Sequence, residues 1–117
     1  MVSLSRFFRR IKGRLMPDQS SPKPSTGGVW NSILSDLPPN SPIVPYALER
    51  HHVGVERYGT PLQPFNGRDW KVDLMQEIAD ASAYSKQGVL EGDDRAKKYH
   101  DACMLIFKEM VEEFGGE

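Results

Sequence analysis

Acidic side chains recur on one face of a helix predicted in the second half of the chain, a pattern that can bind a divalent cation. At 100° per residue, Asp69, Asp73, Glu77 and Asp80 fall within a sector of about 80° that holds no lysine or arginine. Like charges three or four residues apart destabilise a helix. The helix dipole offsets this repulsion near the first turn, but not for Glu77 and Asp80. A hard cation such as Mg²⁺ would offset it, whereas the alternative is a solvated acidic face.

A second row of candidate ligands lies on the preceding predicted helix. Glu49, His52 and Glu56 are spaced i, i+3 and i+7, and therefore share one line along that helix. If the two helices form an antiparallel hairpin, both rows point into one cleft, as in the metal sites of helical bundles. The alternative is that His52 packs at the edge of the core while both glutamates are solvated.

These rows need helices to position them, and helical patterns account for most of the chain. Ser41 with Pro42 and Asn66 with Asp69 are start signals, whereas Gly59 and Gly88 are stop signals. The predicted helices cover residues 29–37, 43–58, 68–87 and about 93–114. No strand pattern of comparable strength occurs, so the predicted fold is all-α, a small bundle of three to four helices.

The apolar residues of the last two predicted helices indicate how these helices pack. The final helix carries one strip at the 3.6-residue period, which we expect to be its core face: Ala96, Tyr99, Cys103, Ile106, Phe107, Met110 and Phe114. On the helix before it, apolar residues cover more than half of the circumference: Trp70, Val72, Leu74, Met75, Ile78, Ala79 and Ala81. Such a wide arc predicts a central helix wrapped by neighbours, a second subunit among them.

Charge divides the chain into a basic tail and an acidic body. The 117 residues have a net charge of −1, made of +5 over residues 1–28 and −6 over residues 29–117. We therefore predict a flexible basic N-terminal tail and linker over 1–28 and a helical domain over 29–117. The tail has helical apolar spacing over residues 1–16, so it could contact a partner protein or an anionic membrane surface; the alternative is a solubilising tail. An acidic body is a poor surface for nucleic acid, and no stable complex with nucleic acid is expected.

Composition excludes several further classes of protein. No apolar run approaches the roughly 20 residues of a membrane span. One cysteine, Cys103, excludes an internal disulfide and a cysteine-rich zinc site, and fits a reducing compartment. It lies within an apolar strip, where a thiol is inert. No glycine-rich phosphate loop and no catalytic serine–histidine arrangement is present.

Residues 57–84, with the sequence RYGTPLQPFNGRDWKVDLMQEIADASAY, resemble short phage-encoded proteins. Within them, EIAD resembles the second metal motif, E-x-x-D, of the MazG-like all-α nucleoside triphosphate pyrophosphohydrolases. The resemblance implies that Glu77 and Asp80 bind metal, that a nucleoside triphosphate is the substrate, and that the chain is a homo-oligomer. The first motif of that family, E-x-x-E, is missing before residue 77. Its place is taken by the row at Glu49 and His52, and a histidine there favours Mn²⁺ or another transition metal over Mg²⁺.

The leading hypothesis is therefore a metal-dependent nucleotide pyrophosphohydrolase, with Mg²⁺ or Mn²⁺ as cofactor. The expected metal ligands are Glu49, His52, Glu56, Asp73, Glu77 and Asp80, and the expected catalytic residues are Glu56, Glu77 and Asp80. Candidates for phosphate contact are Arg95, Lys97 and Lys98, whose alternative is ordinary solvated charge. If the resemblance holds, the protein acts in the cytoplasm of a phage-infected bacterium. The alternatives are a non-catalytic helical phage module that binds a protein partner, and a peripheral membrane adaptor that uses residues 1–16.

Overall fold

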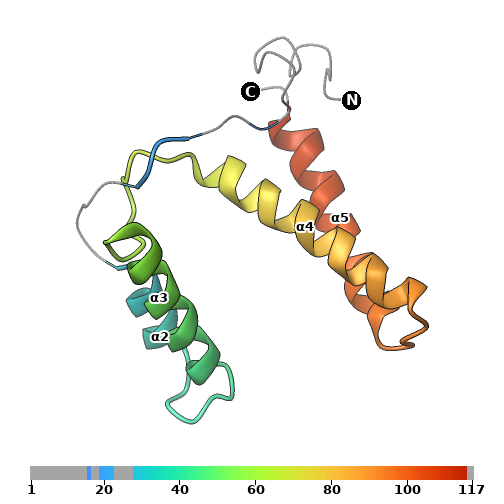
Figure 1. Ribbon diagram of the computed structural model, residues 1–117, viewed down its shortest axis with the longest axis horizontal. Helices are drawn as coiled ribbons and strands as arrows, with labels where there is room; N and C mark the ends of the chain where they lie inside the picture. The colour runs from blue at the N-terminus through green and yellow to red at the C-terminus, as the bar shows by residue number, and fades with distance from the viewer. Residues whose placement is uncertain (1–15, 17–18, 23–27, 116–117) are drawn as a thin grey trace. The chain divides into compact units, whose positions relative to one another are not determined.

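The described residues, 16, 19–22 and 28–115 of a computed structural model, form four helices and no strand (Figure 1). The helices are α2 (Val29–Asp36), α3 (Val44–Tyr58), α4 (Trp70–Leu90) and α5 (Ala96–Phe114). The all-α prediction is confirmed. None of these helices is long and apolar enough to cross a membrane. Most of the predicted tail, residues 1–28, lies outside the described residues.

The chain divides into two compact units, one of residues 19–68 and one that begins at Asp69. In the first unit α2 contacts α3, and the N–H of Val29 donates to the carbonyl of Leu62 over 2.9 Å. Arg68 donates from Nη1 to the carbonyl of Ser20 over 2.7 Å, so this residue of the predicted linker is bonded to the body. Among the described residues of this unit, Ala47 is the buried apolar one.

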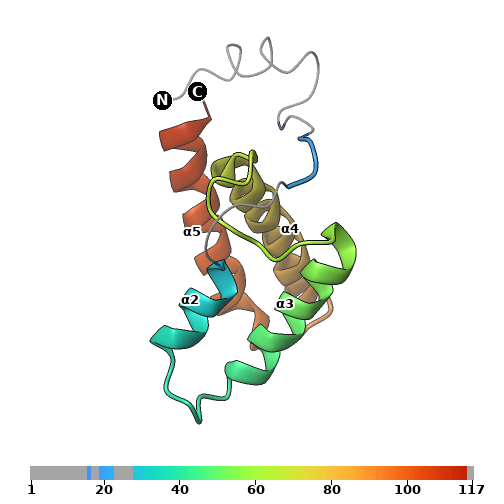
Figure 2. The same ribbon diagram turned by 90° about the vertical axis from the view of Figure 1, so that its left-hand side faces the viewer.

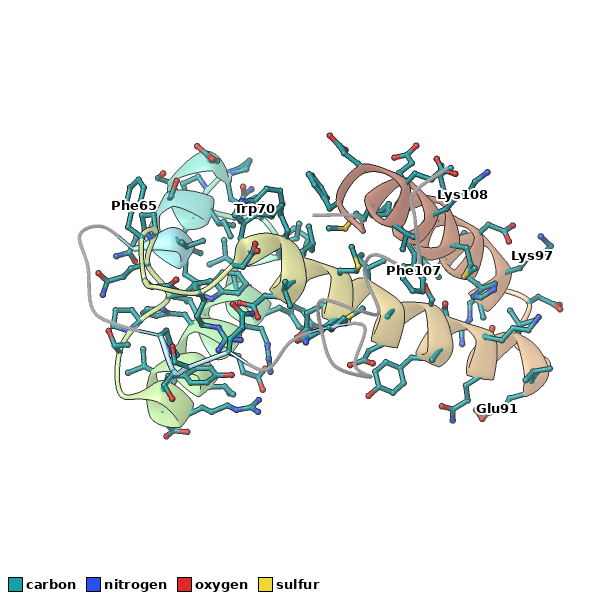
Figure 3. All side chains as sticks on the ribbon, turned by 90° about the horizontal axis from the view of Figure 1, so that it is seen from above. Phe65, Trp70, Glu91, Lys97, Phe107 and Lys108 are labelled. Atoms are coloured by element: carbon teal, nitrogen blue, oxygen red, sulfur yellow. The ribbon has the colours of Figure 1, made fainter. Side chains whose placement is uncertain are left out.

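In the second unit α4 and α5 form an antiparallel hairpin, and Figures 1 and 2 show the two helices side by side. Met75 and Met110 are its buried apolar residues. At the open end of the hairpin the rings of Trp70 and Phe114 meet edge to face, with centroids 5.7 Å apart. Phe107 lies between the helices in Figure 3, so the strip of α5 that includes Phe107 and Met110 is its core face.

The predicted start of α2 and the predicted end of α3 agree with the structure. α2 covers all but the last residue of the predicted range. α3 ends at Gly59, which has a φ of 74°, in the left-handed region that favours glycine.

The predicted end of α4 at Gly88 is wrong. The helix continues to Leu90, and the left-handed residue of the turn is Gly92, with a φ of 86°. A Cβ atom on Gly88 would lie 2.8 Å from the Cβ of Ala96. Glycine is needed at position 88 because α5 begins so close to α4, not because the helix stops there.

The predicted starts of α3 and α4 are one and two residues too early, and both predicted N-caps are wrong. Ser41 accepts from the N–H of Ile43 within a turn, and α3 begins only at Val44. The N-cap of α4 is Asp69, whose Oδ1 accepts from the N–H of Lys71 over 3.0 Å. Asn66 instead closes the preceding turn by accepting from the N–H of Arg68. A short polar side chain bonds either a turn or a helix end, so composition alone does not distinguish these roles.

Candidate functional site

The acidic row of α4 does not act as one unit, because its first member caps the helix. Asp69 accepts from the N–H of Lys71, and the Nζ of Lys71 lies 4.0 Å from its Oδ1. This lysine lies outside the acidic sector on the helical wheel, yet its long side chain reaches back to Asp69. The carboxylate of Asp69 thus has a structural role at the start of the helix.

The next three acidic residues remain on one face of α4. Asp73 is half-buried in the first turn, where the helix dipole favours a negative charge. Glu77 and Asp80 are exposed, and at 100° per residue they lie about 140–160° around the helix from buried Met75 and Ser82. No described residue forms an ion pair with Glu77 or Asp80. These two carboxylates therefore face solvent as uncompensated neighbours one turn apart.

The neighbours expected to wrap α4 cover less of it than the sequence predicts. Met75 and Ser82 are its only buried residues, while the Trp70 side chain is 62% exposed and Leu74 is also exposed. α5 covers one side of the helix, and the wide apolar arc extends beyond the side that a single neighbouring helix can bury.

The second row, on α3, lies along one face as predicted. His52 Nε2 is 3.1 Å from Glu56 Oε1 across one helical turn, and both side chains are mostly exposed. Glu49 is exposed as well. α3 belongs to the unit of residues 19–68, and α4 to the unit that begins at Asp69. A cleft shared by the two rows therefore stays a prediction.

Within the part of the chain that the structure describes, no three histidine, cysteine, aspartate or glutamate side chains converge to hold a metal ion. The oxygen donors of Glu77 and Asp80 are nevertheless of the type that Mg²⁺ prefers. That ion commonly binds through one or two protein carboxylates and completes its shell with water and substrate phosphates. The donor set on α4 fits such a partial shell and does not form a closed cage.

The three candidate phosphate contacts have different surroundings. Arg95 donates from Nε and Nη2 to the two carboxylate oxygens of Asp93, over 3.0 and 2.7 Å. Lys97 is 2.7 Å from Asp101. Lys98 lies over the ring of Tyr99, with Nζ 5.0 Å from the centroid. Arg95 and Lys97 are therefore neutralised by carboxylates of their own helix or turn, whereas Lys98 contacts an aromatic face.

The carboxylates that pair with these cations titrate below their usual range. Hydrogen bonds from the side chain and N–H of Arg95 lower the pKa of Asp93, and the same pairing raises the pKa of Arg95. The hydrogen bond from Lys97 lowers the pKa of Asp101. These carboxylates therefore stay ionised at neutral pH beside Arg95 and Lys97, near the start of α5.

The structure also shows a serine–histidine contact that the sequence did not indicate. His100 Nδ1 lies 3.1 Å from Ser85 Oγ and 3.1 Å from the carbonyl of Ser82, across the α4–α5 interface. Ser85 Oγ donates to that same carbonyl over 3.1 Å. The contact joins α4 and α5, because both polar groups also meet the Ser82 carbonyl. Residues 85 and 100 share no sequence pattern, because only the hairpin brings them together.

No model of a protein family, no curated protein and no solved structure matches this chain.

Proposed function

We propose that this protein is a metal-dependent nucleoside triphosphate pyrophosphohydrolase in which Glu77 and Asp80 bind the metal. One observation carries the proposal: α4 presents these two carboxylates side by side on an exposed face, with no described cation to compensate them. Repulsion between them weakens the helix, and binding a divalent cation would remove that repulsion. The resemblance of EIAD to the E-x-x-D metal motif supports the same two residues.

In the proposed reaction, water attacks the α-phosphorus of a nucleoside triphosphate and releases a nucleoside monophosphate and pyrophosphate. A bound Mg²⁺ or Mn²⁺ would supply charge neutralisation for the triphosphate and a more acidic water. Glu77 and Asp80 would hold that ion by their exposed oxygens. Asp73, one turn before Glu77 on the same face, would accept hydrogen bonds from ion-bound water and orient it.

A titration of the thermal unfolding temperature with Mg²⁺ and with Mn²⁺ tests the metal site in the wild type and in Glu77→Gln. The wild-type Tm is expected to rise with metal, because an ion that binds only the folded state stabilises it. Glu77→Gln should lose that rise and keep or slightly raise the stability without metal. Glu91→Gln is the matched control, since Glu91 is an exposed carboxylate at the other end of α4. It should respond to metal as the wild type does.

A panel of nucleoside triphosphates with either metal, assayed for pyrophosphate, tests the activity on the same three proteins. Release by the wild type and by Glu91→Gln, but not by Glu77→Gln, supports the proposal. If neither metal moves the wild-type Tm and no nucleotide is hydrolysed, the proposal is wrong.

A second candidate function is a helical module that binds a protein partner. It is favoured by the large apolar side chains that the described residues expose, which outnumber the three apolar residues that they bury. Exposed apolar surface of this extent marks interaction sites in soluble proteins. A chain that associates but neither binds metal nor releases pyrophosphate would support this function over the enzymatic one.

A further inference from the structure

An exposed apolar strip runs along one edge of α5. Tyr99, Ala102 and Ile106 are spaced i, i+3 and i+7, so they form one line of about 10 Å along the helix. Tyr99 is 59% exposed and Ile106 is 42% exposed. The sequence places both in the core strip, but α4 alone covers too narrow a sector of α5 to bury them. The edge of α5 next to its core face is thus apolar and uncovered.

The neighbouring edge of α4 extends this apolar surface. Trp70 and Leu74 are both exposed, and with Gly88 they fall within a sector of about 40° on α4. Contacts of Trp70 with Phe114 and the close approach of Gly88 to Ala96 show that this edge borders α5. Because antiparallel helices turn in opposite senses, this edge and the strip of α5 lie on the same side of the hairpin. We call this side the strip face.

Opposite charges lie at the two ends of the strip. Lys98 precedes it and Glu109 follows it, eleven residues or three turns later, so the two lie on one line along α5. The other lysines of α5 have carboxylate partners on their own helix, Asp101 for Lys97 and Glu112 for Lys108. For Lys98 and Glu109, the described residues provide no such partner. Glu113, one turn beyond Glu109, also has no cationic partner among the described residues. The strip is therefore flanked by an unmatched cation at one end and by unmatched anions at the other.

We propose that two copies of this chain pair through the strip face, with their α5 helices antiparallel about a two-fold axis near residue 103. In this arrangement Lys98 of each copy meets Glu109 of the other, while Tyr99 of each copy packs near Ile106 of the other. Ala102, next to the axis, is small enough to let the helices approach closely. A parallel pairing would instead set Lys98 against Lys98 and Glu109 against Glu109.

A second copy is the occupant that the charges favour. A two-fold interface uses the same patch on both subunits, so the patch must complement itself. Lys98 and Glu109 satisfy that condition only when the helix is reversed, and the reversed helix also matches apolar residues with apolar residues. This inference stands on the strip face alone and does not depend on the proposed enzymatic function.

The first test compares two substitutions in the full chain by sedimentation velocity over a range of concentrations. Ile106→Glu places a charge in the strip, and it should convert a dimer to a monomer. Met104→Glu is the matched control, because Met104 is 45% exposed on the opposite edge of the same helix. It should leave the dimer intact. A wild type that stays monomeric at every concentration, or equal loss of the dimer in both variants, would overturn the proposal.

The second test uses surface charges, whose exchange leaves the apolar packing of the helix in place. Lys98→Glu and Glu109→Lys should each weaken the dimer about tenfold, because each change turns two attractive pairs into two repulsive ones. The double exchange in one chain restores both pairs and should recover the wild-type dissociation constant. Failure of the double variant to recover, or no weakening by either single change, would show that α5 does not pair in this way. Circular dichroism of each variant checks its helicity, and the charge variants decide the question if Ile106→Glu unfolds.

Discussion

Replacing Gly88 by alanine tests the closest approach between α4 and α5. Within a helix, alanine is more favourable than glycine by up to about 1 kcal/mol. Against this gain, the added methyl group would lie 2.8 Å from the Cβ of Ala96, a separation at which something must shift. That atom is attached directly to the backbone of α5, so the helix itself would have to move.

The expected result is a net loss of stability. Overpacking of this kind costs about 1–3 kcal/mol, so Gly88→Ala should lower the free energy of unfolding by about 1 kcal/mol. Gly54→Ala is the matched control, because Gly54 is also inside a helix and a Cβ there meets no heavy atom within 4 Å. It should raise the free energy of unfolding by up to about 1 kcal/mol. The two substitutions have the same chemistry and opposite expected signs.

Urea unfolding followed by far-ultraviolet circular dichroism measures both effects. A double-mutant cycle with Ala96→Gly then isolates the contact, because removing the methyl group of Ala96 leaves room for one at position 88. In that background Gly88→Ala should become neutral or stabilising, with a coupling of about 1 kcal/mol or more. If Gly88→Ala stabilises the wild type as Gly54→Ala does, the close approach of the two helices is refuted.

Two further predictions concern the start of α5 and its contact with α4. Asp93→Asn should lower stability at neutral pH. The folded-state pKa of Asp93 is lowered below 3.8. The stability that its ionised carboxylate contributes is therefore fully present above pH 3.8 and is lost as the pH falls through the folded-state pKa. The difference between the two proteins, measured by thermal unfolding, should therefore vanish in strong acid; a difference that persists there would contradict the role of Arg95. His100→Ala should cost about 1–2 kcal/mol because it removes contacts with both the Ser85 hydroxyl and a backbone carbonyl. Ser85→Ala should cost less, and equal losses in urea unfolding would mean that the carbonyl contact contributes nothing.

Part of the candidate site could be predicted from the sequence. Helical periodicity placed Asp73, Glu77 and Asp80 on one face of one helix, and the structure agrees, because the angle between residues of a helix is fixed by the backbone. The sequence predicts Asn66 and not Asp69 as the N-cap of α4, because a short polar side chain can bond either a turn or a helix end. Periodicity also gives no information about the reach of the Lys71 side chain to Asp69. The metal and the substrate stay predictions, and so does a cleft that the row of Glu49, His52 and Glu56 on α3 shares with the acidic residues of α4.

The helical class, the approximate extent of each helix and the end of α3 at Gly59 could be predicted from the sequence. These features depend on local backbone preferences and on which residues avoid water. The pairing of the helices, the need for glycine at position 88 and the contact between His100 and Ser85 depend on the tertiary structure. The exposure of Tyr99 and Ile106 depends on it as well. The physical reason is that a 3.6-residue pattern marks the apolar side of a helix, whereas burial depends on how much of that side a neighbour covers.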